Sequence, residues 1–301
     1  MTSDMPAEFA RWLAEWRRAE QLPPAFATVV ERLHLPLAAA LAHAASAQQG
    51  LFVVGLCGAQ GSGKSTMVRV LAQLLSGRGL RVAVLSIDDL YATRAQRQRL
   101  AAQIHPLLAT RGPPGTHDLA LGLEVLADLA AGKGTALPRF DKARDDRCPR
   151  GEWPLVGRVD VLLFEGWCVG ARAEPEAALA APINALERDE DRAMVWRRHV
   201  NAALAGDYAA LFARIDRLVM LRAPSFDAVR MWRLEQEAKL RAIRGTGPGS
   251  RVMSEDEVLR FVQFFQRTTR QIEREMPERA DMVVMLDTAR QVRDWRGVMM
   301  A

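Results

Sequence analysis

The sequence predicts an α/β fold in which a Rossmann-like parallel sheet of about five strands is flanked by helices. Three observations support this prediction. From Leu51 onward, short apolar runs of strand length alternate with helical stretches, as in βαβ units. The first run leads straight into a glycine-rich turn, and the residues before Leu51 have apolar side chains at helical spacing. The expected strands are residues 51–57, 81–87, 159–164, 218–221 and 282–286.

The N-terminal residues are expected to form helices outside the sheet. Phe9, Leu13 and Trp16 have helical spacing, and residues 33–45 form a second helical stretch. Nothing in these helices indicates a chemical role. We therefore divide the chain into an N-terminal helical extension (1–48) and a main domain (49–301) with a helical lid at about 225–255.

The composition is that of a folded protein, and the sequence lacks the patterns of nucleic-acid-binding, membrane-spanning and secreted proteins. Hydrophobic residues make up 49% and charged residues 26% of the 301, so the chain can bury a sizeable core. The net charge of +5 comes almost wholly from arginine, and no basic run interleaved with aromatics marks a nucleic-acid groove. The apolar runs are too short for a bilayer, the N-terminus lacks a signal-peptide pattern, and the three cysteines show no CxxC pairing. We expect a cytoplasmic monomer or small homo-oligomer with no nucleic-acid or membrane partner.

Residues 58–65 carry the most specific motif of the chain. They read GAQGSGKS, a full GxxxxGK[ST] match between a strand and a helix, which is the context that a P-loop requires. Glycines let backbone N–H groups close around a phosphate at a helix N-terminus. Lys64 is expected to reach the β- and γ-phosphates of ATP, and Ser65 to hold Mg²⁺; the alternative is a chance glycine turn. The predicted ATP-binding residues are Gly58, Ala59, Gln60, Gly61, Ser62, Gly63, Lys64, Ser65 and Thr66.

The third expected strand ends in an acid, as a Walker B strand does. Glu165 would lie beside the P-loop where the two strands are neighbours, so we predict that it holds Mg²⁺ or its waters together with Ser65. Asp160, at the start of the same strand, is expected to face solvent, and Gly166 to leave room for a ligand. The alternative for Glu165 is a solvated surface residue, since polar residues flank buried strands in any case.

Two carboxylates follow the second expected strand. Asp88 and Asp89 come at the C-terminal edge of the sheet, where ligands of doubly wound folds bind. Phosphoryl transfer to an alcohol needs a group that orients the hydroxyl and accepts its proton. We predict that Asp88 is this catalytic base and that Lys64 is the catalytic cation. The alternative is that either aspartate caps the following helix, which we favour for Asp89.

Two long polar segments, residues 111–118 and 137–154, are expected to bind the acceptor. Loops of this length in a compact domain tend to be functional or disordered. Their cations, carboxylates and histidine suit the clamping of a carboxylate and the hydrogen bonding of hydroxyls, as in a small hydroxy acid. The alternative is a pair of solvated, charge-rich loops. The predicted acceptor-binding residues in these loops are Arg111, His117, Asp118, Arg139, Asp141 and Lys142.

An arginine-rich segment follows the fourth expected strand. Arg233 and Lys239 are candidates to bring positive charge from a mobile lid, which would stabilise the transferred charge and exclude water. Their alternation with glutamates is equally typical of a solvent-facing helix. After a glycine-rich break, Ser254 and Glu257 predict a capping box at the start of the next helix.

With these motifs laid out, the chain resembles the glycerate kinases of the plant and fungal P-loop type. These belong to a larger group with uridine kinase, phosphoribulokinase and bacterial pantothenate kinase. The resemblance covers most of residues 50–290 and none of residues 1–48. It rests on the ordered segments GAQGSGKST, SIDDLY, HPLLATRGPPGTHD, LPRFDKARDDR, DVLLFEGWCVG, PINALE, WRRHVN, APSFDAVRMWRLEQE, MSEDEVLRFVQFFQRTT and MPERAD.

The resemblance implies an activity. The group carries its catalytic aspartate in a D-x-[FL]-Y element, which Asp88, Leu90 and Tyr91 match, so the resemblance favours Asp88 over Asp89 and places Tyr91 in the acceptor site. The segment PRFDKARDDR lacks the histidine of uridine kinases, which disfavours a nucleoside acceptor. The implied reaction is that of a D-glycerate 3-kinase, which converts ATP and D-glycerate into 3-phospho-D-glycerate and ADP. The alternatives are another P-loop metabolite kinase, uridine- or pantothenate-like, or a non-catalytic ATP-binding regulator.

Overall fold

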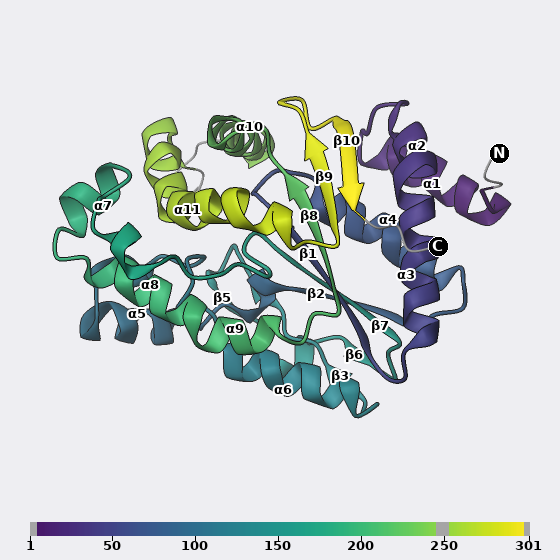
Figure 1. Cartoon of the computed structure of the whole chain (residues 1–301), viewed down its shortest axis with the longest axis horizontal. Coiled ribbons are helices and arrows are strands. Elements are labelled where there is room, and N and C mark those ends of the chain that lie inside the picture. Colours follow the sequence, from purple (N-terminus) through teal and green to yellow (C-terminus); the bar gives the residue numbers. More distant parts are fainter. Residues whose placement is uncertain (1–4, 245–252, 298–301) are drawn as a thin grey trace.

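A six-stranded sheet runs through the centre of the molecule, with helices on both of its faces (Figure 1). The structure is a computed structural model and describes residues 5–244 and 253–297. The strand order is β10-β9-β8-β1-β7-β2. Five of these strands run parallel and confirm the five predicted ones: β1 (Phe52–Gly58), β2 (Val82–Ser86), β7 (Val161–Gly166), β8 (Arg217–Arg222) and β9 (Met282–Leu286).

The sixth strand, β10 (Val292–Gly297), was not predicted. It pairs antiparallel with β9 at the edge of the sheet, and its side chains are half-buried or exposed. The sequence VRDWRG therefore lacks the apolar run that marks the buried parallel strands. The reversal is built by Asp287, whose Oδ1 accepts hydrogen bonds from the N–H groups of Ala289 (2.9 Å) and Gln291 (2.8 Å).

Successive side chains of β1 enter two different cores, because neighbouring residues of a strand point to opposite faces. Val53 and Cys57 lie in one core, and Val54 and Leu56 lie in the other. The first core is covered by α6 (Leu119–Ala130), α8 (Val195–Ala205), α9 (Asp207–Phe212) and α11 (Glu255–Glu275), and the second by α1 (Ala7–Ala19), α3 (Leu35–Ala47), α4 (Lys64–Ser76) and α10 (Phe226–Arg244).

The predicted N-terminal helices are present and pack against the sheet. The helix α2 (Phe26–Val29) and a π-helical turn (Val30–His34) join α1 to α3. Leu13 and Leu33 of this segment are 3% and 1% exposed and belong to the same core as β1 and α4. Within the described residues, no helix combines the length and apolar character that crossing a membrane requires.

The remaining helices are α5 (Arg94–Gln103) and α7 (Ala185–Glu190). Two small antiparallel sheets complete the fold, β3 (Thr135–Ala136) with β6 (Leu155–Val156) and β4 (Phe140–Asp141) with β5 (Asp146–Arg147). The predicted capping box begins α11, since Ser254 Oγ accepts from Glu257 N–H (3.2 Å) and the Glu257 carboxylate accepts from Ser254 N–H (2.7 Å). Residues 245–252 of the predicted lid lie outside the described residues.

Candidate active site

The P-loop joins the end of β1 to the start of α4, as predicted. Gly61 and Gly63 have φ of +78° and +90°, a left-handed conformation that glycine adopts without strain. Ser62 is 3% exposed, and its Oγ has no hydrogen-bond partner among the described residues. The Lys64 ammonium donates a hydrogen bond to the Ala59 carbonyl (3.1 Å), which holds it across the loop. The loop therefore presents backbone N–H groups and one lysine at the N-terminus of α4.

Two residues that sequence analysis missed hold the P-loop from outside. A Cβ at Gly61 would lie 2.9 Å from the Cβ of Trp232, so α10 packs directly on the loop. The Trp232 indole donates to the Thr288 carbonyl (2.7 Å), and Arg290 Nε donates to the Gly61 carbonyl (2.9 Å). The Arg290 guanidinium also lies 5.4 Å from the centre of the Trp232 ring. The β9–β10 turn and α10 thus hold the loop together, and no local motif marks either residue.

The acids of β7 lie at opposite ends of that strand. Glu165 is half-buried at the carboxyl edge, in register with Leu56 of β1 and Ser86 of β2, so it lies between the P-loop strand and the strand that leads to Asp88. Asp160, predicted to face solvent as an ordinary strand boundary, instead accepts hydrogen bonds from the Arg81 guanidinium. The bond to Arg81 lowers the pKa of Asp160 to about 2.

The predicted role of Gly166 is wrong. A Cβ at this position would lie 2.3 Å from Cγ2 of Ile87 and 3.1 Å from Cγ2 of Val169. The space beside Gly166 is therefore filled by protein and is not left for a ligand. Glycine is needed here because the 3₁₀ turn Ile87–Leu90, which carries Asp88, packs directly on β7.

Asp88 lies in this turn with both carboxylate oxygens bound. Its Oδ1 accepts from the Tyr91 hydroxyl (2.7 Å) and its Oδ2 from the Lys142 ammonium (2.6 Å). Burial by itself would raise the pKa of Asp88, but the charge and hydrogen bond of Lys142 and the bond from Tyr91 outweigh it, so the pKa is lowered. Asp88 is an ionised carboxylate at neutral pH. The structure thus brings together three of the predicted residues, from two distant segments.

Asp89 has a different task from the one predicted. Its Oδ1 accepts from the Phe140 N–H and its Oδ2 from the Arg139 guanidinium, both at 3.1 Å. The next helix, α5, is capped by Thr93 instead. Asp89 therefore anchors the β4–β5 hairpin, and the prediction that it caps a helix is wrong. Burial raises its pKa despite Arg139.

Asp145 ties the two acceptor loops to each other. It is paired with Arg111 and with Arg97, whose Nη2 donates to Asp145 Oδ2 (2.7 Å). Arg97, which sequence analysis missed, is 1% exposed, and it also donates to the carbonyls of Ala92 and Ala109. Both guanidiniums lie 5.7 Å from the centre of the Phe140 ring. Arg111 is thus held at the edge of the cluster that contains Tyr91, Asp88 and Lys142.

His117 lies against the same cluster. Its ring centroid is 4.8 Å from that of Tyr91, and its Nδ1 shares a short hydrogen bond with the Tyr208 hydroxyl. Its Nε2 is buried and has no partner within the described part of the chain. Burial lowers the pKa of His117 to about 4, so the ring is neutral at neutral pH. Tyr208, 91 positions away in the sequence, was not predicted as a site residue.

Three other predicted acceptor residues make contacts that stabilise the loops. Asp118 caps α6 by accepting from Leu121 N–H (3.1 Å) and accepts from Arg147 (3.0 Å). Asp141 accepts from the N–H groups of Ala143 (2.8 Å) and Arg144 (3.1 Å) in the turn that carries Lys142. Arg139 pairs with Asp89, as described above. A direct contact of these three with the acceptor stays a prediction.

The predicted lid residues lie on α10. Arg233 pairs with Glu237 (2.8 Å), and its guanidinium lies 5.6 Å from the centre of the Phe261 ring on α11. Lys239 is exposed two residues beyond Glu237. Arg233 therefore joins α10 to α11 here, and the role of both residues in closure stays a prediction.

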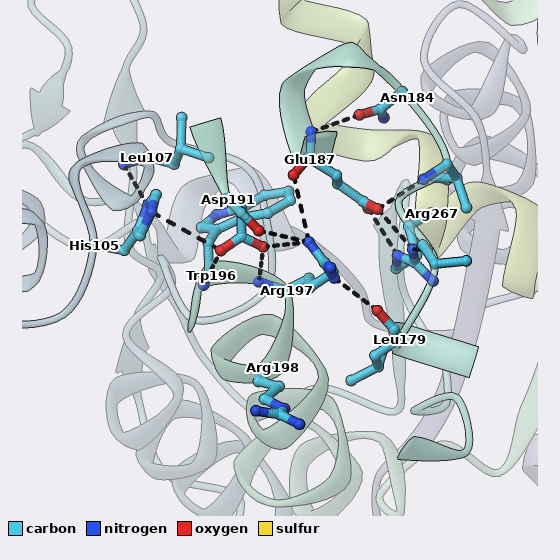
Figure 2. A network of polar contacts seen from close by, with 12 residues as sticks. His105, Leu107, Leu179, Asn184, Glu187, Asp191, Trp196, Arg197, Arg198 and Arg267 are labelled. Atoms are coloured by element: carbon cyan, nitrogen blue, oxygen red, sulfur yellow. Dashed lines mark hydrogen bonds and ion pairs between the residues drawn. The ribbon is translucent and has the colours of Figure 1, made fainter. Parts of the chain in front are cut away.

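A buried network of charges joins α7, α8 and α11 to the turn that begins at His105 (Figure 2). Arg197, 3% exposed, donates to the Asp191 carboxylate (3.1 Å) and to the Leu179 carbonyl (2.8 Å). Arg267 of α11 forms a two-point ion pair with Glu187 of α7, at 2.6 and 2.7 Å. On the other side of Asp191 lies His105 (3.9 Å), which begins the turn leading to Arg111. Figure 2 shows Asp191 between His105 and Arg197, so the network links α8 to the loop that carries Arg111.

A cleft of about 650 Å³ lies at the same edge of the sheet. It opens where β8 and β9 end, between the start of α10 and one face of α11. Glu273 lines it, and burial raises the pKa of Glu273 to about 7 although Arg222 opposes this. The cleft is next to the P-loop strand, because Leu221, the residue before Arg222, is in register with Gly58.

Comparisons with known proteins agree with the fold and the motif. A family model described as methylmalonyl Co-A mutase-associated GTPase MeaB matches residues 26–94, less than half of the chain, which include the P-loop. The uncharacterized kinase mug58 of Schizosaccharomyces pombe is 33% identical over 225 residues, which cover 71% of this chain and 78% of that protein. The chloroplastic D-glycerate 3-kinase of Arabidopsis thaliana is 33% identical over 222 residues, which cover 70% of this chain but 45% of that enzyme.

The fold has a close counterpart among solved structures. The D-glycerate 3-kinase from Cryptococcus neoformans superimposes with a TM-score of 0.73 at 25% identity, covering 90% of this chain and 99% of that one. The chain belongs to the family of P-loop kinases that includes the D-glycerate 3-kinases, and it is a phosphotransferase.

Proposed function

We propose that this protein is an ATP-dependent D-glycerate 3-kinase, which converts ATP and D-glycerate into ADP and 3-phospho-D-glycerate. The observation that carries the proposal is the ionised carboxylate of Asp88, which is held by Tyr91 and Lys142 next to Arg111 at the P-loop edge of the sheet. Such a group suits an alcohol acceptor, and the neighbouring cations suit one that is also a carboxylate. The cytoplasmic location stays a prediction.

The P-loop fits a nucleoside triphosphate. Residues 58–66 offer backbone N–H groups, the Lys64 ammonium and the unpartnered Ser62 hydroxyl to phosphate oxygens. The Ser65 hydroxyl and the Glu165 carboxylate are oxygen donors of the kind that Mg²⁺ prefers, and Mg²⁺ commonly takes only one or two protein ligands besides phosphate and water. They would hold the ion, which when bound neutralises charge on the β- and γ-phosphates.

The residues around the glycerate site supply a base that takes the hydroxyl proton and cations that bind the glycerate carboxylate. The C3 hydroxyl oxygen of glycerate attacks the γ-phosphorus, the bond from that phosphorus to the bridging oxygen breaks, and ADP leaves with the electron pair. Asp88 takes the hydroxyl proton, which contributes about 10²- to 10⁴-fold in rate. Lys142, whose side chain is 61% exposed, is free enough to move from Asp88 to the glycerate carboxylate, beside Arg111. Arg233 and Lys239 of α10 are the proposed lid cations.

An ADP-release assay with a panel of acceptors tests the proposal. The purified chain with Mg²⁺ and ATP is offered D-glycerate, L-glycerate, uridine and pantothenate, and ³¹P NMR identifies the phosphorylated position. We expect turnover with D-glycerate and a 3-phosphate product. Turnover with uridine or pantothenate instead would assign a related metabolite kinase, and ATP binding without any turnover would favour a regulator.

A lysine substitution provides the internal control of this assay. K64A removes the cation over the β- and γ-phosphates and is expected to abolish turnover without unfolding the chain, since the hydrogen bond that the Lys64 ammonium makes among the described residues is to the Ala59 carbonyl within the same loop. K133A changes an exposed lysine that pairs with Asp128 and should keep full activity. Loss of the folded state in K64A would contradict the proposed role of Lys64.

A further inference from the structure

The two tyrosines of the chain, Tyr91 and Tyr208, both lie against the ring of His117. Tyr91 belongs to the proposed acceptor site, since its hydroxyl binds Asp88. Tyr208 lies on α9 behind His117, is fully buried, and packs edge-on against Phe212. It therefore has no route to a substrate, and its effect on the reaction has to pass through His117.

The neighbours of the Tyr208 hydroxyl determine to which atom its O–H donates a hydrogen bond. Its oxygen accepts a hydrogen bond from the Gly115 N–H (3.1 Å). The buried O–H also has to donate its one proton, and it has a single acceptor within hydrogen-bonding distance among the described residues. This acceptor is Nδ1 of His117. Burial raises the pKa of Tyr208 well above its usual value, so this proton stays on the oxygen.

The tautomer of His117 follows from this bond. The ring is neutral, and a neutral imidazole carries its one proton on the nitrogen that is not accepting a hydrogen bond. Because Nδ1 accepts from Tyr208, the proton is on Nε2. This Nε2–H is buried and unpartnered in the described residues, next to the Tyr91 ring and within electrostatic reach of Asp88. A buried donor without a partner needs an explanation, and here, beside Tyr91 and Asp88, a ligand oxygen would supply one.

We propose that Tyr208 is a positioning residue that fixes the Nε2–H tautomer of His117, which then donates a hydrogen bond to an oxygen of the acceptor. The proposal deepens the proposed function and rests on it. A neutral donor suits this place because it can bind a hydroxyl or carboxylate oxygen without adding a second full positive charge beside Asp88. The Gly112 and Gly115 backbone keeps the loop close enough for the bond, since Gly115 has φ of +92° and a Cβ there would lie 2.8 Å from Nε2 of His199.

The first test measures the tautomer directly and does not depend on the substrate. The side-chain ¹⁵N shifts of His117 in the uniformly labelled wild-type protein, assigned by comparison with H117N, report which nitrogen is protonated. We expect a protonated Nε2 and an unprotonated Nδ1 at pH 7. A protonated Nδ1 would overturn the proposal even if the protein phosphorylates glycerate, and a protein without glycerate turnover would leave this readout intact.

The second test separates positioning from folding. Y208F keeps the ring and removes the hydroxyl, so we expect the KM for the acceptor to rise about tenfold while the KM for ATP stays within about twofold. H117N should give a similar rise, and Y208F combined with H117N should add little, because both changes remove one interaction. F212L, which alters packing around Tyr208 and Phe164 but removes no polar group, is the matched control and should leave the KM for the acceptor unchanged. Equal changes in both KM values, or additive effects in the double variant, would overturn the proposal.

Discussion

Two buried histidines lie on opposite sides of the sheet and differ in what surrounds them. His34, in the N-terminal helices, packs against the Phe26 ring at 5.8 Å, and its Nδ1 has no partner among the described residues. His117, in the acceptor loop, is bound by Tyr208 and lies against Tyr91. Burial lowers both pKa values to about 4. A depressed pKa therefore reports burial alone, and only the partners of His117 indicate a functional site.

The two sides of the sheet on which these histidines lie, the N-terminal helical side and the acceptor side, differ in the same way. In the described residues before β1, His34 is the one buried polar side chain, and the rest of that layer's interior is apolar. The acceptor side instead buries Arg97, Arg197 and Arg267 against carboxylates and backbone carbonyls. Apolar packing tolerates no polar ligand, whereas networks of this kind fix the direction of donors and acceptors. Substitutions on the first side should therefore change stability, and substitutions on the second side should change catalysis.

The largest expected effect is that of D88N on the acceptor side. The substitution keeps the size of the side chain and removes its basicity, so kcat should fall about 10²- to 10⁴-fold while ATP affinity is retained. Steady-state kinetics and nucleotide titration measure the two quantities. D89N is the matched control, because Asp89 anchors Phe140 and does not bind Lys142, and it should lose far less activity. Parallel losses of ATP binding and turnover in D88N would place Asp88 at the metal instead.

The next effect is that of L33A on the N-terminal side. Leu33 is 1% exposed in the core that contains β1, so its truncation should lower the free energy of unfolding by about 2–5 kcal/mol. Denaturant unfolding measures this change, and kcat below the unfolding transition should match the wild type. L155A removes a leucine that is 75% exposed and should be nearly neutral. If the fully folded L33A variant had a lower kcat than the wild type, the proposed difference between the two sides would be wrong.

The smallest effect is the pH dependence of stability that His34 contributes. Its pKa in the folded chain is about 4, against the unperturbed value of 6.5, so the unfolded state binds more protons between these values. The contribution of His34 to the free energy of unfolding is fully present above pH 6.5 and is lost as the pH falls toward 4. Between pH 6.5 and 5 this amounts to about 2 kcal/mol. H34Q, which does not titrate, should show a correspondingly shallower loss by thermal unfolding, and an unchanged slope would show that His34 is not buried neutral.

Much of the fold could be predicted because its signals are local. The P-loop lies within eight residues, the five parallel strands are continuous apolar runs, and the Ser254–Glu257 capping box spans one helical turn. The predicted residues Asp88, Tyr91, Arg111, His117 and Lys142 also come together, because the two polar loops fold back onto the turn that follows β2 at the carboxyl edge of the sheet.

The rest depends on contacts between distant segments. Gly166 was assigned to a ligand because the sequence does not say that Ile87 packs on it. Asp89 was assigned to a helix cap because its partner, Phe140, comes 51 positions later. Tyr208 and Arg97 carry no motif at all, and their roles follow only from the loops that fold against them.

The antiparallel strand β10 has a consequence for how the protein behaves at high concentration. A parallel sheet that ended at β9 would expose a nearly uninterrupted row of apolar side chains and backbone groups, ready to add a strand from another molecule. β10 covers that row and presents Arg293, Asp294 and Arg296 to the solvent. Charges on an outermost strand oppose edge-to-edge polymerisation, so the short, polar strand β10 makes this edge of the sheet a poor template for aggregation.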